Sequence, residues 1–258
     1  MGVVNVTPDS FSGDGSSDPD RSAALAREQR DAGADLLDFG AESTRPGHQP
    51  IDEATELERL LPALERFRGG DSQSIVSIDT FKPGVFRRAH AAGGDILNSI
   101  WGAGDELLEA ALECAAPIVV MHNKMRAEYR DVVEEVVAYL DAAAHRAVER
   151  GFATQNVIVD PGFGFGKTAE HNIALLGALD RLVALGFPTL VGMSRKSTIG
   201  KLTGKIVGDR VFGTSATVAL AAAAGIDIVR VHDVAPARDV VAVVDAVKRN
   251  WRPPGWER

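Results

Sequence analysis

The sequence predicts a single-domain α/β fold in which eight parallel strands and eight helices alternate and close into a (β/α)8 TIM barrel. Three observations support this prediction. The length of 258 residues suits one such barrel. Short β-branched runs alternate with longer Ala-, Leu-, Glu- and Arg-rich stretches of helical spacing. No Pro-, Gly- or Ser-rich linker divides the chain, so we expect one domain over residues 1–258. An open, doubly wound sheet is the alternative.

The strands are the short apolar runs. In chain order they are VVNV at 3–6, DLLDF at 35–39, IVSI at 75–78, ILN at 96–98, IVVM at 118–121, VIV at 157–159, TLV at 189–191 and IVRV at 228–231. The stretches that follow them repeat apolar residues at helical spacing. They predict helices at 20–32, 52–67, 83–92, 105–115, 131–150, 170–185, 209–224 and 236–250. Each strand, helix and next strand form a right-handed unit, and eight such units close a barrel.

Two of the connections are long and polar. TPDSFSGDGSSDPD follows the first strand and GAESTRPGHQPI follows the second. Both are rich in Gly, Ser and Asp, the residues of turns and irregular loops. We therefore expect long mobile loops after strands 1 and 2.

Composition excludes several classes of function. A formal charge of −8 without a run of Lys and Arg argues against a nucleic-acid partner. The longest apolar tract, at 216–226, is shorter than the ~20 residues needed to cross a bilayer, and predicts a buried helix. The start of the chain lacks the basic and apolar regions of a secretory signal, and a single cysteine rules out an internal disulfide framework. A cytoplasmic protein without membrane partners is expected.

Polar side chains follow every predicted strand, at the end where barrel active sites lie. They are Asn5, Glu42, Arg45, Asp79, Asn98, His122, Asp160, Ser194, Arg195, Lys196, Arg230 and His232. Carboxylates and an amide suit the edge of a flat heterocycle, and the cationic and neutral polar groups suit a diphosphate or another anion. Any one of these residues alone is explained as well by a helix cap or a turn. His122 by itself is more often structural than a metal ligand.

The segment VDPGFGFGKT at 159–168 resembles a phosphate-binding loop but does not satisfy its pattern. That pattern requires glycine where this chain has Pro161. Asp160 directly follows an apolar strand, and Gly162 and Gly164 leave the backbone small. We expect a carboxylate held at the end of a strand, followed by a backbone too small to block a ligand.

Seven motifs in order resemble the dihydropteroate synthase family. They are NVTPDSFS, ESTRPG, SIDT, VVMH, DPGFGFGKT, GMSRKS and RVHDV, and they span essentially the whole chain. The resemblance implies a transferase of folate biosynthesis. Such an enzyme condenses 6-hydroxymethyl-7,8-dihydropterin diphosphate with p-aminobenzoate to 7,8-dihydropteroate and diphosphate, by SN1-like loss of diphosphate. It also implies small-molecule substrates, inhibition by sulfonamides and a homodimer formed through barrel helices, for which the 214–224 helix is one option.

The same resemblance implies roles for individual residues. Pterin binding falls to Asp79, Asn98, Met121, Asp160, Lys196 and Arg230. Diphosphate binding falls to Asn5, Arg45, Arg230 and His232, with Mg²⁺ beside it and Asn5 as its protein ligand. The p-aminobenzoate pocket falls to Phe11, Thr44, Pro46, Phe165, Lys196 and Ser197. The catalytic groups are Asp79, Asp160, Lys196, Arg230 and His232.

Two positions depart from the family pattern, and two other functions remain open. The first loop reads SFSGDG where the family usually has SFSDGG, and Ser99 stands where the family often has Asp. One alternative is a domain that presents methyl-tetrahydrofolate to a corrinoid protein, but that methyl donor has no diphosphate to occupy Lys196, Arg230 and His232. The other is a non-catalytic paralogue that only binds pterin.

Overall fold

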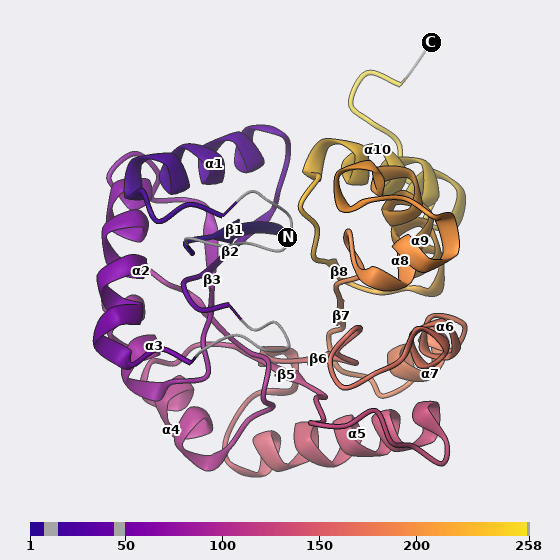
Figure 1. Cartoon of the computed structure of the whole chain (residues 1–258), viewed down its shortest axis with the longest axis horizontal. Helices are drawn as coiled ribbons and strands as arrows, with labels where there is room; N and C mark the ends of the chain where they lie inside the picture. The colour runs from indigo at the N-terminus through magenta and orange to yellow at the C-terminus, as the bar shows by residue number, and fades with distance from the viewer. Residues whose placement is uncertain (8–14, 44–49, 257–258) are drawn as a thin grey trace.

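The protein is described by a computed structural model that covers residues 1–7, 15–43 and 50–256. Figure 1 shows a ring of strands surrounded by helices, which is the architecture of a TIM barrel. The predicted site residues Phe11, Thr44, Arg45 and Pro46 lie outside the described residues, as does much of the two long polar loops.

The predicted parallel strands are all present, and they close on themselves. Their bounds are β1 Gly2–Asn5, β2 Leu36–Gly40, β3 Ile75–Asp79, β4 Ile96–Ser99, β5 Ile118–Met121, β6 Val157–Asp160, β7 Leu190–Val191 and β8 Ile228–Val229. The first six pair in chain order, and β7 pairs with β8. Single parallel bridges join Val159 to Thr189 and Gly2 to Val231. These bridges connect the two groups at both edges, so the closed barrel is confirmed and the open sheet is wrong.

The helices form the outer layer (Figure 1). Their bounds are α1 Pro19–Asp31, α2 Glu53–Arg68, α3 Pro83–Ala91, α4 Asp105–Glu113, α5 Val132–Glu149, α6 Ala169–Leu176, α7 Leu179–Val183, α8 Ser197–Thr203, α9 Val211–Ala224 and α10 Val234–Lys248. The single helix predicted at 170–185 is wrong, because α6 stops at the poor helix former Gly177 before α7 begins. The seven-residue α8 was not predicted, since it is too short to show a helical period.

Side chains along each strand point alternately outward to the helices and inward to the barrel interior, which gives two separate hydrophobic cores. Leu37 and Phe39 of β2 belong to the large core between strands and helices. Ile96, Val119 and Ile158 belong to a smaller core inside the barrel. The inward positions nearer the carboxyl ends are polar, and this places the functional residues on a closed apolar floor.

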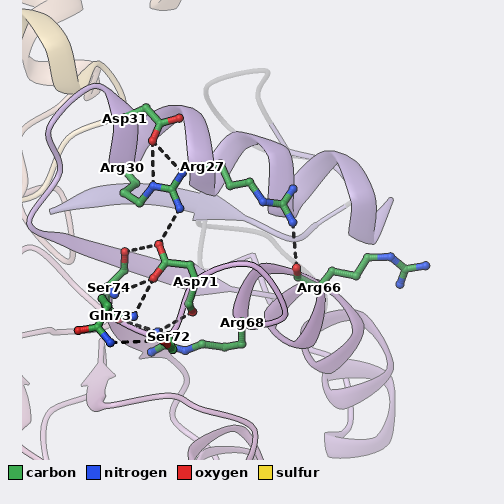
Figure 2. A network of polar contacts seen from close by, with 9 residues as sticks. All are labelled: Arg27, Arg30, Asp31, Arg66, Arg68, Asp71, Ser72, Gln73 and Ser74. Atoms are coloured by element: carbon green, nitrogen blue, oxygen red, sulfur yellow. Dashed lines mark hydrogen bonds and ion pairs between the residues drawn. The ribbon is translucent and has the colours of Figure 1, made fainter.

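A polar network fixes the turn between α2 and β3 (Figure 2). The Asp71 carboxylate accepts hydrogen bonds from the backbone N–H groups of Gln73 and Ser74, at 2.9 and 2.8 Å, and from the Ser74 hydroxyl, at 2.7 Å. Arg30 of α1 adds an ion pair at 2.8 Å. Arg68 donates to the carbonyl of Ser74 at 2.6 Å. The network joins two outer helices to the start of β3.

One helix is more exposed than the sequence suggested. The prediction of a buried helix at 216–226 is wrong for its outer face, where Leu220 is 53% exposed. Phe212, earlier in α9, is 85% exposed. No helix in the described parts of the chain is both long enough and apolar enough to cross a membrane.

Candidate active site

The strand register places predicted polar residues at one level of the barrel. Asn5 pairs with Gly40, Gly40 pairs with Asp79, and Asp79 pairs with Asn98. Their neighbours along each strand pack outward against the helices, so these side chains face the interior at the carboxyl ends of β1, β3 and β4. The structure therefore brings together three residues that the sequence spreads from position 5 to position 98.

Asp38 organises this ring, and the sequence analysis missed it. Its side chain is fully buried. One carboxylate oxygen, Oδ2, accepts a hydrogen bond from Arg230 Nε at 2.6 Å, and both oxygens lie 3.2 Å from Asn98 Nδ2. Arg230 also donates to Asp79 Oδ2 at 3.3 Å. Asp38 lies within its strand rather than after it; the available signal was the second aspartate of the run DLLDF, between apolar residues.

The ring contains two carboxylates beside one guanidinium, and the ionisation of Asp79 reflects this setting. Burial, followed by the charge of Asp38, raises the pKa of Asp79 to about 7, although Arg230 opposes the shift. A carboxyl group that titrates near neutral pH is typical of a functional site. The ring can therefore donate hydrogen bonds to one side of a polar ligand or accept hydrogen bonds from that side.

Asp160 completes the interior on the far side. It pairs in register with Met121, whose side chain is buried, and its Oδ1 accepts the backbone N–H of Gly162 at 2.7 Å. Burial raises the pKa of the Asp160 carboxyl, opposed by that hydrogen bond and by the charges of Lys196 and other cations.

Lys196 stands at the start of α8 and reaches into the same space. Its Nζ donates a hydrogen bond to the carbonyl of Phe163 and lies 4.7 Å from the centre of the Phe165 ring. Burial lowers the pKa of Lys196 to about 8, while Asp160 and Asp79 oppose the shift. The lysine therefore interacts electrostatically with both carboxylates predicted to bind one ligand.

Two contacts join the loops that follow β7 and β8. The Ser194 hydroxyl oxygen accepts the backbone N–H of His232 at 3.1 Å and lies 3.0 Å from its Nδ1. Arg195 makes two parallel bonds to Asp233, with Nε–Oδ2 at 3.0 Å and Nη2–Oδ1 at 2.6 Å. His232 belongs to the first pair, and Lys196 directly follows Arg195 of the second, so the contacts fix the relative position of the lysine and histidine.

The glycines of the loop after β6 adopt backbone conformations that favour glycine. Gly162, Gly164 and Gly166 all have positive φ, at 68, 79 and 56°, a region that side chains disfavour. A Cβ on Gly162 would overlap the carbonyl oxygen of His122, and one on Gly166 would overlap that of Lys124. The side chain of His122 itself is buried.

Two further predicted residues, Phe165 and Ser197, lie near Lys196. Phe165 is half-buried beside Lys196, and Ser197 is exposed at the first position of α8. Ser99 is fully buried and accepts the backbone N–H of Trp101 at 3.4 Å. That bond supports the turn after β4, which gives the serine a structural role at the position where the family often has Asp.

A divalent cation would have few protein ligands here. Within residues 1–7, 15–43 and 50–256, no group of three or more His, Cys, Asp or Glu side chains is arranged to hold a metal. Mg²⁺ keeps several waters and commonly takes only one or two protein ligands beside substrate phosphates. The half-exposed Asn5 at the end of β1 fits that minimal donor set.

Comparisons with known proteins identify the family of the chain. Residues 1–232 match the family model described as pterin binding enzyme. The dihydropteroate synthase of Bacillus subtilis (strain 168) is 40% identical over 250 residues, which are 96% of this chain and 87% of that protein. The chain belongs to the dihydropteroate synthase family. It is accordingly a transferase of folate biosynthesis.

Solved dihydropteroate synthases superimpose over nearly the whole chain. The enzyme of Xanthomonas albilineans with 4-aminobenzoic acid is 40% identical, with a TM-score of 0.90 over 98% of this chain and 93% of that one. The enzyme of Thermus thermophilus in complex with 6HMPPP is 44% identical, with a TM-score of 0.84 over 96% and 93%. The barrel predicted from sequence is thus shared with enzymes of this family.

Proposed function

We propose that the carboxyl end of this barrel condenses 6-hydroxymethyl-7,8-dihydropterin diphosphate with p-aminobenzoate. One observation carries the proposal: Asp38, Asp79, Arg230 and Asn98 form a single buried network, with Asp160 and Lys196 coupled to it electrostatically. Such a network offers acceptors and donors to a flat ring on several sides. The Xanthomonas and Thermus complexes support the two substrate classes.

The pterin would lie inside the ring of strand ends. Asp160 and Asp79 would accept its N–H groups, Asn98 would use its amide, and Lys196 would donate to a ring acceptor. Departure of diphosphate leaves positive charge on the pterin methylene and ring, and buried carboxylates favour that charge because few waters screen them. Asp79 and Asp160 therefore bind the ring and stabilise the cation. Met121 would line the same pocket.

The diphosphate would face the β1 and β8 ends. Arg230 and His232 would bind its oxygens and neutralise the charge that grows as the bond breaks. Arg45, which lies outside the described residues, belongs to the same proposed group. Mg²⁺ held by Asn5 supplies further neutralisation of the leaving group when it is bound.

The second substrate would enter at the rim. Phe165, Ser197 and the stem of Lys196 would form one wall of the p-aminobenzoate pocket, and Phe11, Thr44 and Pro46 belong to the same proposed pocket. An arylamine is already nucleophilic, so the pocket has to orient it rather than deprotonate it. Competition between a sulfonamide and p-aminobenzoate is expected for the same reason.

A homodimer in the cytoplasm is part of this proposal. Exposed apolar side chains lie on three consecutive outer helices, which are adjacent in Figure 1, and no further partner is needed to cover them. The residues are Leu202 of α8, Phe212 and Leu220 of α9, and Val243 and Val247 of α10. A second copy of the same face would remove them from water. The single free thiol, Cys114, suits a reducing compartment.

Product formation tests the function. The wild-type protein is incubated with the pterin diphosphate, p-aminobenzoate and Mg²⁺, and dihydropteroate is measured by chromatography. We expect dihydropteroate in a one-to-one ratio with diphosphate. Tight pterin binding without product would support the non-catalytic alternative, and methyl transfer from methyl-tetrahydrofolate to a corrinoid protein would support the other one.

A further inference from the structure

Lys167, the lysine of the segment that resembles a phosphate-binding loop, turns back toward its own loop. Its Nζ lies 2.9 Å from His122 Nδ1. It also donates to three backbone carbonyls, of Gly162 at 3.1 Å, of Phe165 at 3.1 Å and of His122 at 3.2 Å. All three acceptors and the imidazole belong to the segments that follow β5 and β6. The ammonium group is thereby saturated by the protein and is not directed toward a phosphate.

The carbonyls that Lys167 binds belong to residues with active-site neighbours. The N–H of Gly162 binds Asp160 Oδ1 at 2.7 Å. The ring of Phe165 lies under Lys196 Nζ, which itself donates to the carbonyl of Phe163. The Lys167 ammonium therefore holds both ends of the turn 162–165. This turn contacts Asp160 and Lys196, which are proposed to bind pterin, and it contains Phe165, which is proposed to line the p-aminobenzoate pocket.

The turn has a hydrogen bond of its own, from the Phe165 N–H to the Gly162 carbonyl at 3.1 Å, but its glycines make it costly to order. Gly162 and Gly164 within it, and Gly166 directly after it, have positive φ, and glycine-rich segments lose the most conformational freedom on ordering. Burial lowers the pKa of Lys167 to about 7, opposed by the charge of Asp160. The protein thus partly buries a cationic side chain next to the Asp160 carboxylate that it helps to position. Burying a charge costs free energy, and a loop that faced solvent would not carry this cost.

We propose that Lys167 is a positioning residue of the active site, which fixes the 162–165 turn so that Asp160, Lys196 and Phe165 meet both substrates in the correct geometry. The proposal depends on the function proposed above. Lys167 touches neither substrate, and its effect passes through the turn. Small displacements of binding groups can cost on the order of 100-fold in rate, so loss of the clamp should affect catalysis far more than global stability.

The test compares Lys167→Met with the matched control Lys205→Met. Methionine keeps much of the lysine volume and removes every hydrogen bond, and Lys205 is an exposed lysine near the end of α8. Three quantities are measured: amide hydrogen exchange of 161–168, pterin affinity by calorimetry, and steady-state kinetics. For Lys167→Met we expect faster exchange in that segment, pterin affinity about tenfold weaker, and KM for p-aminobenzoate raised about tenfold.

The outcomes separate the inference from the proposed function. Faster exchange with wild-type affinity and KM would show that the clamp is only structural and would overturn the proposal, as would unchanged exchange. A wild-type protein that binds pterin but forms no dihydropteroate would refute the proposed function, whereas exchange and affinity would still decide the role of Lys167. If Lys167→Met is insoluble, Lys167→Gln is measured in the same way, and wild-type affinity and KM in that variant would also overturn the proposal.

Discussion

Asp38 Oδ2 lies 2.6 Å from Arg230 Nε, an ion pair between residues 192 positions apart that joins β2 to the end of β8. The Asp38 carboxylate is fully buried, and the guanidinium is 22% exposed. This pair crosses the barrel interior and fixes the cation that also contacts Asp79. The geometry of the proposed pterin and diphosphate sites therefore depends on a residue to which the sequence analysis assigned no role.

Asp38→Asn should destabilise the protein and reduce its activity. Without the Asp38 charge, Arg230 keeps only its longer contact with Asp79 at 3.3 Å, and breaking a buried ion pair typically costs about 3 kcal/mol. Urea unfolding measures the loss. Asp35→Asn is the control, because Asp35 pairs with Arg238 at 3.1 Å on the surface, where the carboxylate is 73% exposed. That variant should lose less than about 1 kcal/mol; equal losses in the two variants would contradict the account.

Asp160→Asn and Lys196→Ala should largely abolish turnover while the barrel stays folded. The first removes the negative charge that favours the pterin cation, and the second removes the donor above Phe165. Steady-state kinetics and circular dichroism check the two statements. Lys201→Ala, on the exposed side of α8, should retain wild-type rates. Wild-type turnover in either site variant would rule out the pterin assignment.

His122 should make the protein less stable in mild acid. Burial, and next the charge of Lys167, lower the pKa of His122 to about 4, below the value near 6.5 of an unfolded histidine. The unfolded chain therefore takes up a proton first, and the stability present above pH 6.5 is lost as the pH falls toward 4. The loss between pH 7.5 and 5.0 is about 2 kcal/mol.

Urea midpoints at these two pH values measure that contribution. A His122→Gln variant should have a smaller pH-dependent loss than wild type, although its absolute stability is lower because the contact with Lys167 Nζ changes. An identical pH dependence in the two proteins would show that His122 does not titrate in this range.

Gly166→Ala should destabilise the loop after β6. The glycine has a φ of 56°, and a Cβ would collide with the carbonyl of Lys124. We expect a loss of at least about 2 kcal/mol, together with a higher KM for p-aminobenzoate because the neighbouring Phe165 would move. Gly208→Ala is the control, since a Cβ there meets nothing within 4 Å. Thermal melts that coincide for the two variants would contradict the predicted strain.

The sequence predicted the fold well because a barrel repeats one pattern many times. Each strand appears as an apolar run, and a polar residue after it falls at the functional end. The pattern failed where a feature was too short or out of place. The helix α8 spans seven residues, and Asp38 lies inside its strand, where the register that directs it inward becomes visible only in the closed barrel.

The sequence also could not assign a target to Lys167. Its motif suggested phosphates, and Pro161 excluded the phosphate-binding loop without naming another partner. The three carbonyls and the imidazole that bind the ammonium come from segments after two different strands, His122 after β5 and the 162–165 turn after β6. Contacts of this kind depend on tertiary geometry rather than on local spacing.

The most direct test of the account is single-turnover release of diphosphate, with Mg²⁺ present, by the wild-type protein and by Lys196→Ala. The account predicts that wild type converts the pterin diphosphate and p-aminobenzoate to equal amounts of diphosphate and dihydropteroate, and that the variant releases neither at a comparable rate. Wild-type protein that binds the pterin diphosphate and releases no diphosphate with p-aminobenzoate present would contradict it.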